Sequence, residues 1–323
     1  MKRPSLIALC YIVVVLPVFL LFAGCKKNDP VPQNGIVPQI AQRMVLVYIA
    51  ANNDLRSEAI NSIIQLQLGA KSLNGDLLVF VKTNPLNSYL LRVNYGTGDK
   101  IVSDTLKIYG EDNTSDASFL GSVINDARAL SPARTYGLVL WSHATAWVPP
   151  ADGIGTKSFG WDDGKEMDIL DLKAILPDDF EYIMFDACSM ASMEVIYELR
   201  DKAKYILASP AEILTTGFPY EKITEHLFTD SAGLKYVSEL FIDHYKARTG
   251  LFSSATVSLI ATEELMPIAS LTQTLLQTAG DNLAINVGQV QRLDFDDAPV
   301  PGYDFLDFLE KHFNENDIGD IKR

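Results

Sequence analysis

Four short apolar runs in this chain are each followed at once by polar or reactive residues, and this pattern constrains the fold more than any other feature. Continuous apolar runs are typical of strands buried on both faces, and the carboxyl ends of parallel strands meet at one sheet edge. We therefore expect the polar residues to gather at that edge. The pairs are Met44–Ala50 with Asn52-Asn53-Asp54, Gly137–Trp141 with Ser142-His143, Tyr182–Phe185 with Cys188, and Tyr205–Ala208 with Ser209.

Segments with helical spacing alternate with these runs, which predicts an α/β fold: a mostly parallel sheet with helices on both faces. Asn52-Asn53-Asp54 is expected to cap the first helix. The interval from Val148 to Gly160 is rich in Gly and Pro and is expected to be a loop. Further helices are expected at 55–68, 116–130, 170–176 and 189–199, and further strands at 77–81, 89–95 and 101–108.

Residues 221–323 are harder to assign. Tyr236–Ala247 and Glu264–Thr278 have helical spacing, and Ala255–Ile260 is a candidate strand. This mainly helical C-terminal region either completes the same domain or forms a helical appendage.

Residues 1–24 have the pattern of an export signal: a basic start at Lys2-Arg3, an apolar stretch and small residues before Cys25. A transmembrane anchor is the alternative, although Pro17 interrupts the run. The ending Ala23-Gly24-Cys25 resembles a bacterial lipoprotein signal, which implies that Cys25 is lipidated and anchors the chain to a membrane. Residues 25–42 would then be a polar tether. Lys26, rather than aspartate, predicts an outer-membrane lipoprotein on its periplasmic or cell-surface face.

The formal net charge is −14 at pH 7, with 41 acidic and 27 basic side chains. A surface of this sign repels nucleic acid, so no nucleic-acid partner is expected. No histidine has metal-ligand spacing, so no metal site is predicted.

Cys188 is the only thiol outside the N-terminal segment that holds Cys10 and Cys25. It follows one buried strand, as His143 follows another, and a nucleophilic Cys/His pair requires that arrangement. The helix expected from Ser189 onward would lower the pKa of the thiol. The alternative is a buried, inert structural cysteine.

Three stretches of the sequence resemble the clostripain family of cysteine peptidases: the first strand with its Asn/Asp-rich turn, Leu140-Trp141-Ser142-His143, and Phe185-Asp186-Ala187-Cys188-Ser189-Met190-Ala191. The resemblance covers most of residues 43–220 and is weaker beyond. It implies a caspase-like three-layer α/β/α sandwich, with residues 43–323 as the peptidase domain. It also implies an endopeptidase that cuts peptide or protein substrates after Arg or Lys through a thioester.

The resemblance assigns roles to single residues. Cys188 would be the nucleophile and His143 the base, while backbone N–H groups of Ala144 and Cys188 would form the oxyanion hole. Asp186 and Ser209 would contact the substrate; a structural acceptor of backbone N–H groups is the equal alternative for Asp186. Lys157 is the better candidate processing site and Lys165 the other. This chemistry requires no cofactor, and calcium dependence is known in the family, although no calcium motif is readable here.

The sequence departs from the family pattern His-Gly-x-Gly-Trp, because Ala144 and Ala146 replace the two glycines. Alanine resists positive φ, so the oxyanion donor at Ala144 would be misplaced if that position needs glycine geometry. Pro210 also stands where the family has an acidic residue. These differences motivate the alternative of a weak or inactive caspase-like surface lipoprotein that binds peptides or glycans.

Overall fold

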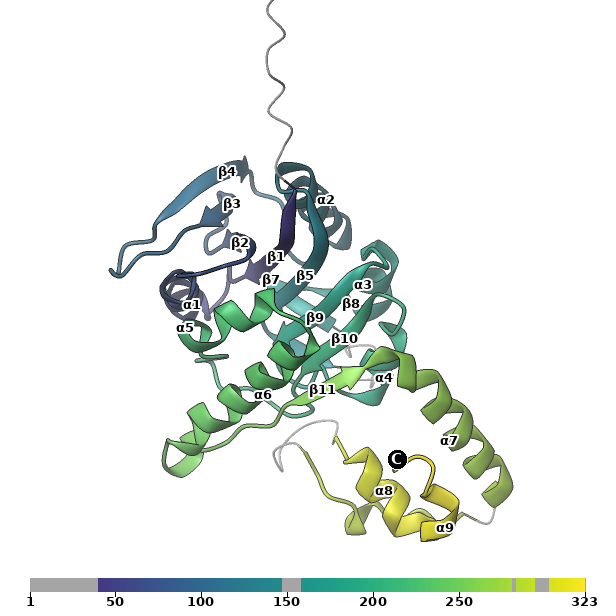
Figure 1. Cartoon of the computed structure of the whole chain (residues 1–323). Coiled ribbons are helices and arrows are strands. Elements are labelled where there is room, and N and C mark those ends of the chain that lie inside the picture. The colour runs from purple at the N-terminus through teal and green to yellow at the C-terminus, as the bar shows by residue number, and fades with distance from the viewer. Residues whose placement is uncertain (1–39, 147–157, 281–282, 294–301, 323) are drawn as a thin grey trace, which may run out of the picture. The chain divides into compact units, whose positions relative to one another are not determined.

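The carboxyl ends of four neighbouring parallel strands lie at one edge of the central sheet in the computed structural model, which describes residues 40–146, 158–280, 283–293 and 302–322 (Figure 1). Within those residues the sheet has the strand order β11-β10-β9-β5-β1-β2-β3-β4. The strands are β1 (Ala41–Ala50), β2 (Gly75–Lys82), β3 (Ser88–Val93), β4 (Ser103–Tyr109), β5 (Ala133–Trp141), β9 (Phe180–Asp186), β10 (Ala203–Ala208) and β11 (Ser258–Ala261).

The five strands from β10 to β2 pair in parallel, whereas β3, β4 and β11 add to the sheet in antiparallel fashion. The buried run in β1 explains the central position of this strand. Met44, Leu46 and Tyr48 pack into the core on one face, and Val45 and Val47 into the core on the other. Because side chains alternate along a strand, a strand that is apolar at every position needs cover on both sides.

Helices provide that cover. α2 (Ala117–Leu130), α3 (Ile169–Ile175) and α4 (Met193–Glu198) bury apolar side chains on the face of Met44. α1 (Arg56–Gly69), α5 (Tyr220–Ile223) and α6 (Ser231–Lys246) cover the opposite face (Figure 1). The predicted α/β/α sandwich with a mostly parallel sheet is therefore confirmed.

The region after residue 220 contributes to the sandwich and continues beyond it. Leu234, Val237 and Phe241 of α6 pack against the sheet, and β11 extends its edge beside β10. α7 (Leu265–Ala279) contributes Leu265 to the core. α8 (Phe305–His312) and α9 (Glu315–Ile318) bury Leu309 and Ile318 outside both core clusters.

Two local predictions were wrong. Asn52-Asn53-Asp54 does not cap α1, whose N-cap is Leu55 without a side-chain hydrogen bond. Asn53 Oδ1 instead accepts from Leu55 N–H at 2.9 Å, a turn that Asn forms with its own backbone. The end of the predicted loop, from Ser158 to Gly160, instead belongs to a strand, β7 (Ser158–Asp162). This strand pairs with β6 (Ala144–Ala146) and β8 (Lys165–Asp168) in a small second sheet.

The predicted signal segment, the lipidated Cys25 and most of the tether lie outside the described residues. Among the helices that the structure describes, none combines the length and apolar character needed to cross a membrane.

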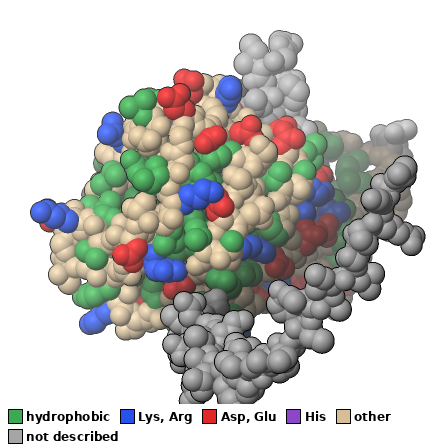
Figure 2. All heavy atoms as spheres, turned by 90° about the horizontal axis from the view of Figure 1, so that it is seen from above, with side chains coloured by type: hydrophobic (Ala, Val, Ile, Leu, Met, Phe, Trp, Pro, Cys, Tyr) green, Lys and Arg blue, Asp and Glu red, His purple; other side chains and the backbone are tan. Residues whose placement is uncertain are grey.

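A buried ion pair joins the main sheet to the second one. Lys82 Nζ, at the end of β2, lies 2.8 Å from Asp162 Oδ2 of β7, with side chains 3% and 0% exposed. Thr114 N–H donates to the same carboxylate at 2.7 Å, and Asn52 Nδ2 donates to its other oxygen at 2.6 Å. These hydrogen bonds outweigh the cost of burial and lower the pKa of Asp162. The face seen in Figure 2, by contrast, shows acidic and basic side chains interspersed at the surface.

We expect Asp162→Ala to lower the free energy of unfolding by about 3–5 kcal/mol, because it leaves the Lys82 ammonium buried without its counter-charge. Glu181→Ala is the matched control: it removes the partner of Lys204, which is 68% exposed, and should cost at most about 1 kcal/mol. Urea denaturation of both variants measures the difference. Similar losses of unfolding free energy in the two variants would show that the buried pair stabilises the fold no more than the exposed one.

Candidate active site

His143 and Cys188 follow two strands that are hydrogen-bonded neighbours. In the parallel pair of β5 and β9, Trp141 is the register partner of Asp186, the last residue of β9. Each candidate residue comes two positions later, so both stand at the same level past the sheet edge, on strands spaced about 4.8 Å apart. Asp54 follows β1 on one side of this pair, and Ser209 follows β10 on the other. The predicted gathering at one edge is confirmed.

The Cys188 thiol is partly buried under the segment that follows β10. Its Sγ accepts from Ile213 N–H at 3.4 Å and lies 3.8 Å from Ile213 O. Burial raises the pKa of this thiol; the hydrogen bond from the Ile213 backbone offsets part of that rise, and the carboxylates of Glu212 and Asp186 add to it. In this arrangement the sulfur is held as a neutral thiol.

The expected helix directly after Cys188 was wrong. α4 begins only at Met193, with Ser192 as N-cap, so no helix terminus lies at the sulfur. The intervening residues form a tight turn in which Ser189 has a φ of 60°. Ser189 N–H donates to Ala211 O at 3.0 Å, which fastens the turn to the segment after β10. The predicted lowering of the thiol pKa therefore lacks its cause.

His143 is held by an acidic residue that the sequence analysis had assigned to a helix cap. Its Nε2 lies 2.8 Å from Asp54 Oδ1, and its ring centroid is 5.6 Å from that of Trp161. The hydrogen bond with His143 lowers the pKa of Asp54 despite the exposure of this carboxylate. An ionised carboxylate only accepts, so Nε2 carries the proton and Nδ1 has a lone pair available as a base.

Asp54 could have been found from the sequence by a simple argument. It follows β1, and β1 is the neighbour of the strand that leads to His143. A carboxylate two to four residues past the neighbouring strand is within reach of the imidazole. No described hydrogen bond joins His143 to Cys188: the imidazole contacts Asp54, and the sulfur contacts the Ile213 backbone.

The backbone around His143 is fixed by four further contacts. Ser142 Oγ donates to Ala50 O at 2.7 Å, and Gly160 N–H donates to His143 O at 2.9 Å. Asn53 Nδ2 donates to Trp161 O at 2.8 Å, and Asn52 contacts Asp162. The turn after β1 and the second sheet together hold the histidine loop.

The geometry of this loop corrects the concern about Ala144. Because His143 O accepts from Gly160 N–H of β7, the N–H of Ala144, on the opposite side of the same trans peptide unit, points away from β7. Positive φ occurs at Ala146, with a value of 60°, and not at Ala144. The replaced glycine that carries strain is therefore the second one. Cys188 N–H, the other predicted oxyanion donor, has no acceptor among the described residues.

Asp186 is 5% exposed and has the contacts of a structural acceptor. Its Oδ2 accepts from Phe218 N–H at 3.2 Å and from Tyr220 OH at 2.8 Å. Burial raises the pKa of this carboxyl to about 6, against the opposing effect of these hydrogen bonds. Ser209 is also buried, and its Oγ contacts Thr256 Oγ1 at 2.7 Å and accepts from Ala211 N–H. Its side chain thus supports the segment that covers Cys188.

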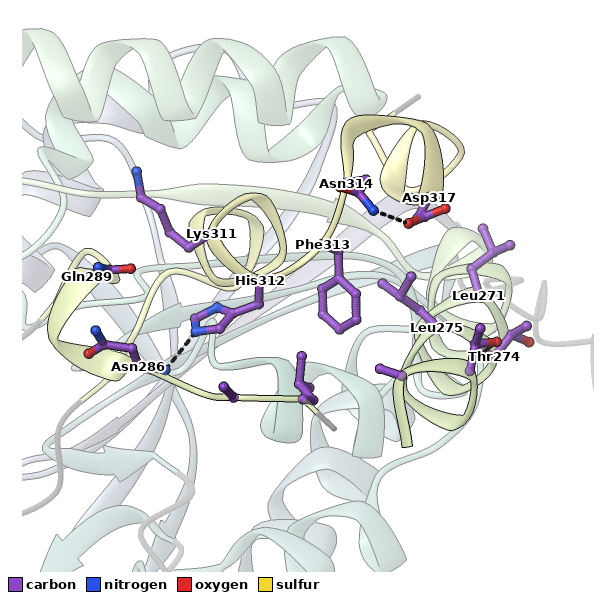
Figure 3. A pocket seen from close by; sticks show the side chains of 14 residues that line it. Leu271, Thr274, Leu275, Asn286, Gln289, Lys311, His312, Phe313, Asn314 and Asp317 are labelled. Atoms are coloured by element: carbon purple, nitrogen blue, oxygen red, sulfur yellow. Dashed lines mark hydrogen bonds between the residues drawn. The ribbon is translucent and has the colours of Figure 1, made fainter. Parts of the chain in front are cut away.

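Lys157, the better candidate processing site, lies outside the described residues. No group of three or more His, Cys, Asp or Glu side chains in the described part of the chain could hold a metal. A hollow of about 680 Å³ lies between α7, α8 and α9, where Phe313 and Leu275 line it together and His312 accepts from Asn286 N–H (Figure 3). Neither His143 nor Cys188 lines this hollow.

Comparison with known proteins agrees with the geometry of this site. A sequence model described as "Clostripain family" matches residues 47–315. No curated protein sequence matches the chain.

Several solved structures are similar to the chain over most of its length. A secreted C11 cysteine protease from Bacteroides thetaiotaomicron, in complex with an irreversible peptide inhibitor, is 28% identical with a TM-score of 0.74, over 87% of this chain and 81% of its own. An inactive zymogen C11 protease from Parabacteroides distasonis is 29% identical with a TM-score of 0.75, over 89% and 82%. A further structure, of a secreted C11 cysteine protease from Bacteroides thetaiotaomicron named "iotapain", is 25% identical with a TM-score of 0.74, over 88% and 83%.

The raised pKa of Asp186 has a measurable consequence for stability. The native state holds this proton more tightly than the unfolded chain, in which an aspartate titrates near pH 3.9, so Asp186 adds stability as the pH falls from about 7 towards 4. Asp186→Asn removes this contribution. We therefore expect the stability of the wild type relative to Asp186→Asn to rise as the pH falls through about 6.

Urea denaturation across that pH range measures this difference. Asp201→Asn, which alters an exposed carboxylate, is the control and should track the wild type. A difference between wild type and Asp186→Asn that stays constant with pH would contradict the raised pKa.

Proposed function

We propose that in this chain, which belongs to the clostripain family of cysteine peptidases, Cys188 is the nucleophile and His143 its partner in proton transfer. The family membership rests on the match over residues 47–315. The observation that carries the residue assignment is the register of β5 and β9, which brings His143 and Cys188 to the same level of one sheet edge. Family membership also favours a peptidase over the binding module considered from the sequence.

The proposed reaction proceeds in two stages. Nδ1 of His143 takes the thiol proton as Sγ attacks the carbonyl carbon of the peptide bond, with backbone N–H groups of Ala144 and Cys188 stabilising the oxyanion. The leaving amine then takes the proton from His143, and a thioester remains. Water, activated by the same imidazole, attacks the thioester; the acid product leaves and the thiol is restored. No cofactor enters these steps.

The described contacts correspond to a resting arrangement. The Ile213 backbone lies against the sulfur, so a substrate carbonyl must displace Ile213 before it can be attacked. Asp54 holds Nε2 and thereby leaves Nδ1 as the base, which makes Asp54 a positioning residue. We further propose that the substrate carries Arg or Lys before the cut bond, as the family resemblance implies and the acidic surroundings of the sulfur favour.

We also propose that the peptidase is a lipoprotein of the outer membrane, anchored through Cys25. Support comes from the basic start, the apolar stretch and the Ala23-Gly24-Cys25 ending of the N-terminal segment. We keep Lys157 as the proposed processing site, as the family resemblance implies.

Fluorogenic peptides that end in Arg or Lys test the catalytic assignment. Cys188→Ala should lower kcat/KM by roughly a thousandfold or more, since it removes the nucleophile. His143→Ala should lower it by about 10²–10⁴, since it removes the base. His244→Ala, a change of a histidine on α6 away from the site, is the control and should leave kcat/KM unchanged. If Cys188→Ala cleaved the peptides as fast as the wild type does, Cys188 would not be the nucleophile.

Asp54→Ala should lower kcat by about 10–100-fold with little change in KM, because the imidazole loses the group that orients it. Asp54→Asn keeps an acceptor oxygen and should recover part of kcat. Glu58→Ala, four residues later in the first turn of α1, is the control. Steady-state kinetics of the three variants separate the cases, and a change confined to KM would argue against a role in orienting His143.

A further inference from the structure

We propose that the exposed indole ring of Trp161 forms an apolar subsite for the substrate residue that follows the cut bond. This inference rests on the proposed function, because it assumes that His143 gives its proton to the leaving amine of a peptide. The side chain accepted on the leaving side of the bond is then apolar, such as that of leucine.

Trp161 lies beside the imidazole of His143 and is open to solvent. The centroids of the two rings are 5.6 Å apart, with the ring planes tilted by 57°, and the tryptophan is 43% exposed. Single exposed apolar side chains are common at protein surfaces, so exposure alone assigns no role to this residue. Its contact with a group that must meet the substrate does.

A β-bulge aims the indole out of the core. The register of β7 against β8 shifts between Phe159 and Trp161, which leaves Gly160 as an extra residue on β7. Residues two apart in a regular strand share a face, so the extra residue allows Phe159 to stay buried while Trp161 turns outwards. Gly160 has a φ of 80°, which glycine adopts without a steric penalty. Bulges next to active sites redirect side chains in this way.

The same strand holds the indole at a fixed place relative to His143. Gly160 N–H donates to His143 O at 2.9 Å. Trp161 N–H donates to Ser142 Oγ at 3.3 Å, and Trp161 O accepts from Asn53 Nδ2 at 2.8 Å. Both backbone groups of the tryptophan are thus bonded to the turns after β5 and β1. Because the indole is already placed beside the imidazole, a ligand that covers it has little loop ordering to offset.

The proposed chemistry brings the residue after the cut bond to this place. Its backbone nitrogen takes the proton from His143, and that transfer requires a heavy-atom distance of about 2.6–3.2 Å. The Cβ of the same residue lies about 2.5 Å from its nitrogen by standard backbone geometry. Its side chain therefore starts next to the imidazole, within reach of the indole that the imidazole contacts.

The charges around the imidazole favour an apolar side chain there. When His143 carries the extra proton it is positive, and Asp54, 2.8 Å from its Nε2, is negative. The pair is then neutral overall and offers no net charge to a substrate side chain of either sign. The indole of Trp161 offers apolar area instead, and covering that area removes it from water, which is favourable.

The first test compares full-length wild type, Trp161→Ala and Trp161→Phe on internally quenched peptides that have Arg before the cut bond and differ only in Leu, Gln or Gly after it. The wild type should cleave the Leu peptide with the highest kcat/KM. Trp161→Ala should lower the ratio of kcat/KM for Leu over Gly by about tenfold, as expected for partial burial of one apolar side chain. Trp161→Phe, which keeps an aromatic ring, should retain most of the ratio.

Tyr236→Ala is the matched control, because Tyr236 is 47% exposed and also lies beside a histidine, His226. It should leave the ratio unchanged. A loss of kcat/KM in Trp161→Ala that is equal for all three peptides would overturn the proposal, since the indole would then only cover His143. Equal cleavage of the Leu and Gln peptides by the wild type would overturn it too.

The second test measures binding without cleavage, so it separates this inference from the proposed function. Full-length Cys188→Ala should bind the Leu peptide with a Kd about tenfold lower than that of the Gly peptide, by isothermal titration calorimetry. Adding Trp161→Ala should abolish this difference, and adding Tyr236→Ala should keep it. Equal Kd values for the two peptides in Cys188→Ala, with cleavage of both by the wild type, would overturn the role of Trp161. Failure of the wild type to cleave any of the peptides would instead overturn the proposed function.

Discussion

The hydrogen-bonded register between β5 and β9 is the constraint on which the site depends. It fixes Trp141 opposite Asp186, and with them the starting points of the two turns that carry His143 and Cys188. A slip of one residue would turn each side chain of the moved strand to the other face. Because both strands are apolar on both faces and lie in the middle of the sheet, the register is specified by the packing of two cores.

What the sheet does not specify is the direction in which each functional group points. That is decided by segments from elsewhere in the chain: the turn after β1 holds His143 through Asp54, and the segment after β10 holds Cys188 through Ile213. The buried pair of Lys82 and Asp162 fixes the second sheet, which in turn holds the backbone of the histidine loop. The site is therefore controlled by tertiary contacts of loops on a rigid edge.

This division also explains what could be predicted from the sequence. The strands were predictable because an apolar run such as Met44–Ala50 has few alternatives, and their common edge follows from parallel pairing. The turn after Cys188 was not, since Ser189 has a positive φ and its N–H donates to Ala211 O, in a segment that local sequence does not reveal as a neighbour. The pairing of Asp54 with His143 was missed for the same reason: local propensity favours a helix cap, and a neighbouring strand offers a stronger partner.

Burial then distinguishes residues that the sequence presents as equals. Asp186 and Glu212 are both acidic and both close to the sulfur, and both raise the pKa of its thiol. One is enclosed by Gly217, Phe218 and Tyr220, and its own pKa is raised because water cannot reach it. The other is exposed. A buried carboxylate already bound by donors stabilises the loop around it, whereas an exposed carboxylate lies where solvent reaches it, so burial, and not position in the sequence, separates the roles of the two.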